Sequence, residues 1–172
     1  MTENNQAKLS KNLIIDSLIE LLKIKSYQEI TITEITKKAG VARLTFYRNF
    51  ENKDAILLTR SDYLFDQFYA ELKSNQAEIS LKNIFKLAFN YWHNDSEFMD
   101  ILIKNDIVYL LEDSFYTYFE KILKDTPSIS RLNNTQKTFI LGGVLRTMLQ
   151  WISSGSPATA EEVTADILEL IQ

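Results

Sequence analysis

Apolar side chains recur at three- and four-residue steps along nearly the whole chain, which predicts an all-α protein. No convincing alternation of apolar and polar residues is present, so no strand is expected. The polar arm over residues 1–7 is expected to fray. Polar, Gly- or Pro-containing breaks are expected at 75–80, 125–134 and 153–157. About nine helices are predicted, over residues 9–25, 32–39, 42–49, 53–74, 80–93, 97–104, 105–124, 135–152 and 159–170.

The region after the first predicted helix carries the local signals of two short helices joined by a tight turn. Thr31 followed three residues later by Glu34 is the pattern of a capping box, which starts the first short helix. Gly40 stands where a left-handed residue would end that helix. In the second short helix, Phe46 and Phe50 have the i, i+4 spacing of a buried pair. Together these features predict a helix-turn-helix.

The outer face of the second short helix is polar and rich in hydrogen-bond donors, as a helix that reads DNA requires. We expect its first residues to face the bases, with Arg43 donating to guanine and Leu44 against thymine methyl groups. An ordinary helical hairpin within a bundle is the alternative that this pattern leaves open. The residues expected to contact DNA are Thr33, Arg43, Leu44, Thr45, Tyr47, Arg48, Asn49 and Lys53.

The run Ala39-Gly40-Val41, followed at fixed spacings by Tyr47, Phe50 and Lys53, resembles the DNA-binding signature of TetR-family transcriptional regulators. The resemblance covers about residues 9–58. Four positions depart from the commonest residues of the signature, namely Thr36, Ala42, Leu44 and Asn49.

This resemblance implies two domains. The first, over residues 1–52, is a three-helix DNA-binding domain of the helix-turn-helix type. The second, over residues 53–172, is a helical domain for ligand binding and dimerisation. The helix predicted over 53–74 carries apolar residues along its whole length, so one helix is expected to link the two domains.

Charge is distributed in agreement with this division. The net charge of −4 by itself disfavours a nucleic-acid partner. However, the first 60 residues carry ten Lys and Arg against seven Asp and Glu, whereas the rest of the chain carries nine against sixteen. The basic residues therefore gather in the part expected to meet DNA. The absence of Cys fits a reducing cytoplasm, and no apolar run is long enough to span a membrane, so we expect a cytoplasmic protein without a membrane partner.

Residues suited to catalysis or metal binding form no recognisable motif. The single histidine, His93, lies near Asp95 and Glu97, but their spacing matches no metal-binding pattern. The sequence contains no Cys–His pair, no Gly-rich phosphate loop and no nucleophile elbow. We therefore expect no enzymatic activity, no metal and no cofactor.

Aromatic residues are concentrated in the second part of the chain, which holds sixteen of the twenty Phe, Tyr and Trp. Most are expected in the core, although a pocket between helices uses the same residue types. Because TetR-like proteins commonly bind an inducer in this region, the resemblance implies a small apolar or aromatic effector. The candidate pocket residues are Phe89, Trp92, Met99, Ile103, Tyr109, Phe115, Tyr116 and Trp151.

Two adjacent glycines, Gly142 and Gly143, lie inside the helix predicted over 135–152. Each costs about 1 kcal/mol relative to Ala, a cost that the close approach of another helix would offset. That helix belongs either to the same chain or to a second copy. The resemblance implies a second copy, since the last two long helices of TetR-like regulators pair with those of a partner. The residues expected at this interface are Gly142, Leu145, Arg146, Leu149, Val163, Ile167 and Leu170.

The function expected from these features is that of a TetR-like repressor. A homodimer would bind a near-palindromic double-stranded DNA operator, and an effector in the second domain would release it. The alternatives are a regulator of the co-activator type that responds to a partner protein, without a small-molecule inducer, and a helical interaction protein that has lost DNA binding.

Overall fold

The computed structural model of the chain describes residues 2–74, 80–124, 126 and 132–171. Within these residues it contains nine α-helices, two short 3₁₀ helices and no β-strand, which confirms the predicted all-α fold. The elements are α1 (Thr2–Leu22), η1 (Tyr27–Glu29), α2 (Ile32–Ala39), α3 (Arg43–Asn49), α4 (Lys53–Ser74), α5 (Leu81–Asn94), α6 (Ser96–Lys104), η2 (Val108–Leu111), α7 (Glu112–Lys124), α8 (Asn134–Ser153) and α9 (Ala160–Ile171).

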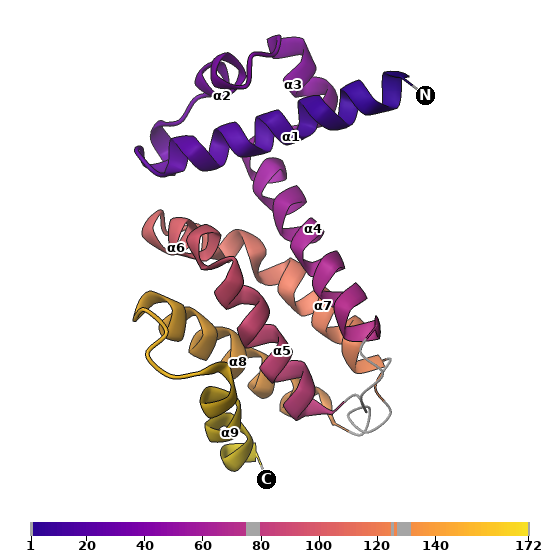
Figure 1. Cartoon of the computed structure of the whole chain (residues 1–172), viewed down its shortest axis with the longest axis vertical. Coiled ribbons are helices and arrows are strands. Elements are labelled where there is room, and N and C mark those ends of the chain that lie inside the picture. The colour runs from indigo at the N-terminus through magenta and orange to yellow at the C-terminus, as the bar shows by residue number, and fades with distance from the viewer. Residues whose placement is uncertain (1, 75–79, 125, 127–131, 172) are drawn as a thin grey trace.

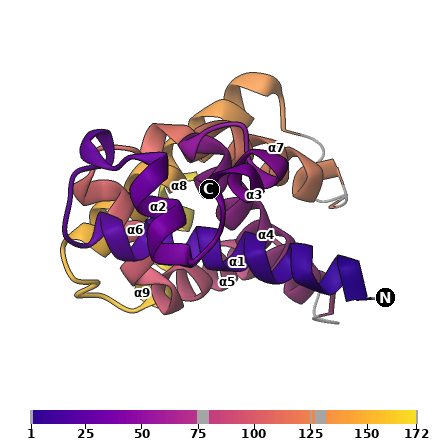
Figure 2. The same ribbon diagram turned by 90° about the horizontal axis from the view of Figure 1, so that it is seen from above.

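The helices form two groups joined by one long helix (Figure 1). Helices α2 and α3 lie across α1 at one end of the molecule, and α1 packs against both of them. Helix α4 runs from this group into a bundle formed by α5 to α9. In the bundle, α7 packs along α4, α9 packs against α5, and α8 packs against α6. Seen from above, α2 and α3 lie in front of the bundle, at the end of the molecule where α4 begins (Figure 2).

The helix-turn-helix has the local structure that its sequence predicts. The Thr31 side chain accepts the Glu34 N–H, and the Glu34 carboxylate accepts the Thr31 N–H, so the capping box is complete. Gly40 ends α2 in the left-handed region at φ 66°. The amides of Gly40 and Val41 donate to the carbonyls of Lys37 and Thr36, which closes the turn as a Schellman motif does. Both ends of α2 are thus confirmed as predicted.

Buried aromatic and aliphatic residues fix this motif on α1. Phe46 of α3 is completely buried, as are Ile14 and Leu18 on the stripe of α1 beneath it. Phe50 is also buried, and its ring centroid lies 6.0 Å from that of Phe46, so the predicted pair is confirmed. A short helix such as α3 is unstable alone, and this packing stabilises it.

Helix α4 has the predicted bounds and buries residues in both groups. Ile56 and Leu57 near its start are fully buried, and Phe65, Phe68 and Leu72 further along are buried with 4–5% of their surface exposed. Most of its exposed positions are polar or charged, with Tyr63 and Ala70 as exceptions. One rigid helix therefore connects the first group of helices to the bundle, as the sequence pattern indicates.

Three predictions about helix limits are wrong. Helix α1 ends at Leu22, three residues before the predicted end at Lys25. The arm expected to fray belongs to α1, which begins at Thr2. Its residues have no apolar periodicity but include good helix formers, so the helix extends into solvent. The single helix expected over 105–124 is broken at Asp106, whose φ is 56°. The Asp106 and Ile107 amides donate to the carbonyls of Ile103 and Leu102, so α6 ends there in a second Schellman motif, and η2 precedes α7.

The breaks predicted at 75–80 and 125–134 lie mostly outside the described residues; Ser80 and Asn133, at their ends, cap α5 and α8. The break at 153–157 is confirmed between α8 and α9, with Thr159 capping α9 as expected. In the described parts of the chain, every helix is too short or too polar to cross a lipid bilayer.

The left-handed conformation of Gly40 gives a test of the turn. A Cβ atom at this position would have open space around it, so a substitution changes the backbone energy and creates no clash. We expect Gly40→Ala to lower the free energy of unfolding by about 1–2 kcal/mol. Gly40→Asn should cost less, because Asn adopts this conformation more readily. Urea unfolding of the two variants measures the difference, and equal losses would contradict the explanation.

Candidate nucleic-acid interface

Helix α3 lies at the end of the molecule that α2 and α3 form (Figure 1), and most of its polar side chains are exposed to solvent. Arg43, Leu44, Tyr47 and Arg48 are exposed, with 61% of Leu44 and 49% of Tyr47 accessible. Because Phe46 anchors the opposite face, the four side chains project away from the protein on a fixed backbone. The structure therefore brings these predicted DNA contacts together on one surface.

Within α3, Arg43 and Tyr47 are paired. The Arg43 Nη2 atom donates to the Tyr47 hydroxyl at 3.1 Å, and the guanidinium lies 5.6 Å from the ring centroid. The contact is exposed, so it holds the Arg43 side chain weakly and leaves its other N–H groups available. An arginine presented in this way retains the donors required for guanine.

The remaining predicted contacts on α3 are less accessible. Thr45 and Asn49 are half-buried, and the Asn49 Nδ2 atom donates to the Thr45 carbonyl at 2.7 Å. Thr33 is exposed in the first turn of α2, where the helix dipole favours an anion such as phosphate. The DNA contacts predicted for these three residues stay predictions.

Lys53 has partners within the protein that its sequence position does not reveal. Its Nζ atom donates to the carbonyls of Tyr27 and Ile30 at 2.6 and 2.7 Å. It also lies 4.3 Å from the centroid of the Tyr27 ring. Burial lowers the pKa of Lys53 from its ordinary value. Two of the three ammonium N–H groups thus tie the first turn of α4 to the α1–α2 connection, leaving one for the predicted phosphate.

The start of α2 is held by charged neighbours. The hydrogen bond from Lys25, followed by those from Thr31, lowers the pKa of Glu34 to about 2. Glu34 therefore stays ionised at neutral pH and offers no hydrogen-bond donor to DNA. Its role is to complete the N-terminal cap of α2 and fix the angle at which α2 leaves the α1–α2 connection.

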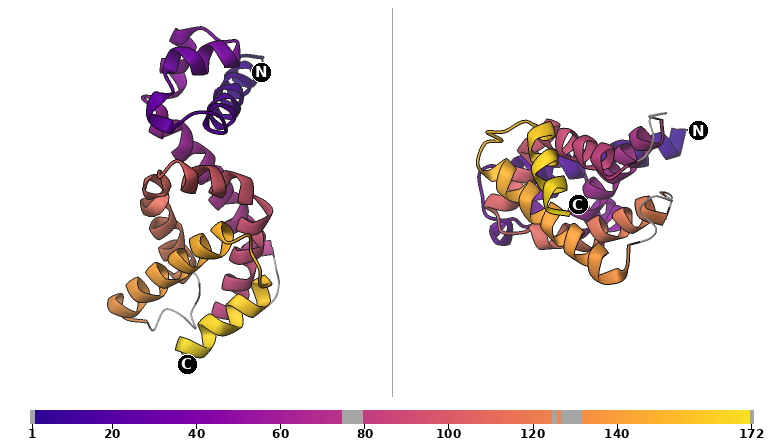
Figure 3. Two further views of the ribbon diagram at one scale, coloured as in Figure 1. Left: turned by 90° about the vertical axis from the view of Figure 1, so that its left-hand side faces the viewer. Right: turned by 90° about the horizontal axis from the view of Figure 1, so that it is seen from below.

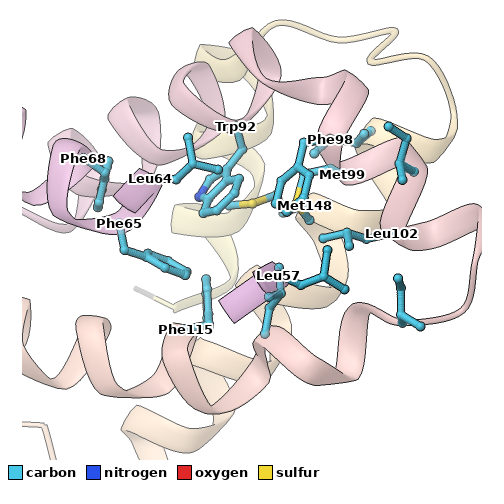
Figure 4. Packing of buried hydrophobic residues seen from close by; sticks show 14 of the residues in the cluster. Leu57, Leu64, Phe65, Phe68, Trp92, Phe98, Met99, Leu102, Phe115 and Met148 are labelled. Carbon is cyan, nitrogen blue, oxygen red and sulfur yellow. The ribbon is translucent and has the colours of Figure 1, made fainter. Parts of the chain in front are cut away.

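The second group of helices encloses two small voids lined by apolar side chains, each of about 20 Å³, room for roughly one water molecule. Both are lined by Phe65, Trp92, Phe115 and Met148, which come from α4, α5, α7 and α8 and point into the same region (Figure 4). The Phe65 ring lies 5.1 Å from the Trp92 ring and 6.2 Å from the Phe115 ring, centroid to centroid. These side chains separate two voids in an otherwise closed core.

The predicted pocket residues divide between the voids and other places. Trp92, Met99 and Phe115 line the second void. Phe89 and Trp151 are buried against each other, while Ile103 and Tyr116 are half-buried on the core's edge. Tyr109 lies apart from the voids, since 62% of it is exposed and it lines an open hollow beside Asp54 and Asp113.

The predicted pocket set did not include Phe65 and Met148, which line both voids. Their periodicity on α4 and α8 marks them as buried but does not show which buried residues meet.

The proposed interface helices, α8 and α9, lie on the same side of the bundle (Figure 3). On α8, Phe139, Gly143, Arg146 and Gln150 are exposed at i, i+4, i+7 and i+11, and 70% of Phe139 is accessible. Leu170 of α9 is 85% exposed. A Cβ atom on Gly142 or Gly143 would meet no atom within 4 Å, so packing within the chain does not explain the two glycines.

Two of the predicted interface residues point into the protomer. Val163 is buried with 8% of its surface accessible, and Leu145 lines the second void. Their apolar periodicity reflects packing of α9 on α5 and of α8 against the core. Gly142, Leu149 and Ile167 are half-buried, whereas Arg146 and Leu170 are exposed. Phe139, which the predicted set does not include, is exposed on α8 beside Arg146.

His93 packs against the ring of Trp151, and its Nδ1 atom lies 3.2 Å from the Ser156 hydroxyl. Across the described residues, no group of three His, Cys, Asp or Glu side chains is placed to hold a metal ion.

Two family models match this chain and together cover most of it. The model described as "Bacterial regulatory proteins, tetR family" matches residues 14–59, which span the helix-turn-helix. The model described as "Transcriptional regulator C-terminal region" matches residues 80–172, more than half of the chain.

Curated relatives are HTH-type transcriptional regulators. YerO of Bacillus subtilis is 24% identical over 128 residues, which cover 70% of this chain and 44% of YerO. EthR of Mycobacterium tuberculosis is 30% identical over 80 residues, which cover 45% of this chain and 37% of EthR. The chain thus spans less than half the length of these relatives.

Solved structures share the fold along nearly the whole chain. A TetR transcriptional regulator from Streptococcus agalactiae superposes with a TM-score of 0.72 at 19% identity, covering 100% of this chain and 98% of that one. FadR from Bacillus subtilis, solved in complex with stearoyl-CoA, superposes with a TM-score of 0.61 at 18% identity, covering 92% and 95%. At such identities the likeness concerns the fold.

The different surroundings of Lys53 and Arg48 predict different effects of removing each charge. Lys53→Met leaves two carbonyls without a charged donor and should lower the free energy of unfolding by about 2 kcal/mol. Arg48→Gln removes an exposed charge, so stability should change by less than about 0.5 kcal/mol. It should instead flatten the slope of log binding constant against log salt for DNA by about 1.

Urea unfolding and salt titrations of DNA binding on the same preparations measure both quantities. If Lys53→Met were as stable as the parent and flattened the salt slope, Lys53 would be a phosphate ligand without a structural role.

Proposed function

This chain belongs to the TetR family of bacterial regulatory proteins, and from that premise we propose that it is a transcriptional repressor that binds DNA as a homodimer. The observation that carries the proposal is the exposed face of α3, held on a capped turn and a buried Phe46, with Arg43 and Arg48 directed into solvent. Residues 1–52 form the DNA-binding domain and residues 53–172 the regulatory domain in this proposal, and the protein acts in the cytoplasm.

Helix α3 reads the major groove in this proposal. Arg43 donates to guanine and Leu44 contacts thymine methyl groups, with Thr45 beside them. The phosphates on either side are held by Tyr47 and Arg48. Thr33, Asn49 and the free N–H of Lys53 complete the set of backbone contacts.

A second copy of the chain supplies the second recognition helix. One seven-residue helix spans too few base pairs for a specific site, whereas a twofold dimer presents two such helices to successive major grooves about 34–36 Å apart. The exposed stripe of Phe139, Gly143 and Arg146 on α8, together with Leu170 on α9, supports these helices as the dimer interface. The operator is accordingly a near-palindrome.

The effector binds in the regulatory domain, where the apolar voids lie. Their lining favours an apolar ligand, and the similar FadR structure that contains stearoyl-CoA favours one with a long hydrocarbon chain. A long chain exceeds the space available, so its entry requires Phe65, Phe115 or Met148 to move. Such movement favours a second packing of the bundle and weakens operator binding by linkage.

The closed core also supports a second candidate function. Among the described residues, the two apolar voids hold about 20 Å³ each, which is too little for an effector without a change in packing. A partner protein that docks on the outside of the bundle would regulate DNA binding without entering it. Release of the operator by a partner, with stearoyl-CoA having no effect, is the outcome that this alternative predicts.

Selection of bound sequences from random double-stranded DNA tests the function directly. The parent protein should enrich a near-palindrome with one preferred guanine in each half-site that depends on Arg43. Arg43→Ala should lose that preference, which is worth about 1–3 kcal/mol, while the rest of the site persists. Lys82→Ala, which removes an exposed cation from α5, serves as the control and should leave the profile unchanged. An unaltered profile with Arg43→Ala would refute the base-reading role.

Sedimentation equilibrium tests the dimer. Phe139→Glu should convert dimers to monomers at micromolar concentration, because a carboxylate would be desolvated in the interface. Since 70% of Phe139 is exposed in the protomer, the variant should keep its helical content. Ile24→Glu is a matched control, since Ile24 is 75% exposed and follows α1 in the first group of helices, so the variant should leave the dimer intact. A parent protein that sediments as a monomer would contradict the proposal.

A further inference from the structure

Helix α6 lies beneath the carboxyl end of α1, at the boundary between the two groups of helices (Figure 1). Polar contacts join both of its ends to the first group. At its amino end, Asp95 pairs with Arg60 of α4 and Glu97 pairs with Lys23, which follows α1, each at 2.8 Å. At its carboxyl end the contact is made by a neutral side chain, Asn105.

The amide group of Asn105 bridges the gap between α1 and η1. Its Oδ1 atom accepts the Tyr27 N–H at 3.0 Å. Its Nδ2 atom donates to the Leu22 carbonyl at 3.3 Å and to the Ile101 carbonyl at 2.9 Å. Leu22 ends α1 and Tyr27 begins η1, so both backbone groups lack partners inside their own helices. Leu22 and Tyr27 are buried, which makes an unpaired group there costly.

Tyr27 carries the connection onward to α4. Its hydroxyl donates to the Asp54 carboxylate, and its carbonyl and ring receive the Lys53 ammonium. Lys53 also binds the carbonyl of Ile30, immediately before the Thr31 cap of α2. The end of α6 is therefore linked through one tyrosine to the first turn of α4 and to the start of the helix-turn-helix.

The Asn105 contact differs in physical character from the ion pairs at the other end of α6. The Glu97 side chain is 73% exposed and that of Lys23 is 33% exposed, so salt and water weaken their attraction. The Asn105 hydrogen bonds are short-ranged and directional, so a small displacement of α6 breaks them. The Schellman turn at Asp106 holds Asn105 at the end of α6, so the side chain moves with that helix.

The same helix touches the regulatory core. Met99 lines the second void and is buried, and it lies six residues before Asn105, about 9 Å along a rigid helix. A change in the void that shifts Met99 consequently shifts Asn105. This route reaches the α1–α2 connection directly, through the hydrogen bonds of Asn105 to Leu22 and Tyr27.

We propose that Asn105 is a positioning residue that sets the placement of the helix-turn-helix according to the position of α6. In one state its amide joins α1, η1 and α6, and in the other these contacts are broken and the α1–α2 connection is released. The inference rests on the proposed DNA-binding function for its physiological meaning, but the mechanical link is measurable without DNA.

A double-mutant cycle between Met99 and Asn105 tests the link in the full-length protein. Met99→Ala enlarges the second void and contacts neither DNA nor the helix-turn-helix. In the parent background we expect it to change the Kd for the selected operator by about fivefold or more, the lower range of allosteric coupling. With Asn105→Ala in the same chain, the effect of Met99→Ala should fall below about twofold. Amide hydrogen exchange in α2 and α3 should follow the same pattern in protein without DNA.

Two further variants distinguish a role of Asn105 in coupling α6 to the helix-turn-helix from an effect on the stability of the fold alone. Asn105→Asp keeps the acceptor for the Tyr27 N–H and loses the donor to Leu22, so it should retain part of the coupling and provides the test if Asn105→Ala does not fold. Glu97→Gln removes the exposed ion pair from the same helix and should leave the coupling unchanged.

Coupling that persists in Asn105→Ala would overturn the inference, as would a Met99→Ala variant that changes neither operator Kd nor exchange. If the protein binds no DNA, the Kd measurement refutes the proposed function. Hydrogen exchange in the protein without DNA then still decides the role of Asn105.

Discussion

One helix, α4, buries side chains in both groups of helices and sets the geometry of this protein. Ile56 and Leu57 of α4 lie in the core near α1 to α3, and Phe65, Phe68 and Leu72 lie in the bundle core. Because α4 is one continuous helix, a displacement of the side chains at one of its ends is transmitted toward the other. The capped turn at Gly40 and the buried Phe46 extend this connection to α3. The exposed arginines of α3 are therefore presented from a framework that reaches the regulatory bundle.

Polar contacts supplement this apolar framework where the two groups of helices meet. Apolar packing tolerates small sliding movements, whereas hydrogen bonds depend on distance and angle. The contacts around Tyr27, Lys53, Asp54 and Asn105 hence specify one orientation of the helix-turn-helix on the bundle. Because hydrogen bonds depend so strongly on distance and angle, a small displacement of α6 breaks them completely. The contact between α6 and the α1–α2 connection is therefore suited to two alternative states.

The bundle formed by α5 to α9 has a core with only small voids among the described side chains, and it exposes apolar surface on α8. Phe65, Trp92, Phe115 and Met148 fill its centre and leave voids that hold about one water each, so occupation by a larger ligand requires a different packing. On the outer side of α8, an exposed Phe139 precedes two glycines at which an added Cβ atom would meet no atom within 4 Å. The proposed effector response rests on these voids, and the proposed dimer interface rests on the exposed surface of α8.

The sequence by itself determined the features that depend on neighbours a few residues apart. The Thr31–Glu34 cap, the left-handed Gly40, the Phe46–Phe50 pair and the limits of α4 all follow from such local patterns. Tertiary structure alone decided which distant residues meet. Lys53, predicted to hold a phosphate, binds carbonyls 26 and 23 residues away, and Asn105, expected within a helix, binds groups 78 and 83 residues away. Periodicity shows that a side chain is buried, but a hydrogen-bond partner brought close by folding has no signature in local spacing, because the intervening chain fixes its position only when the whole core is packed.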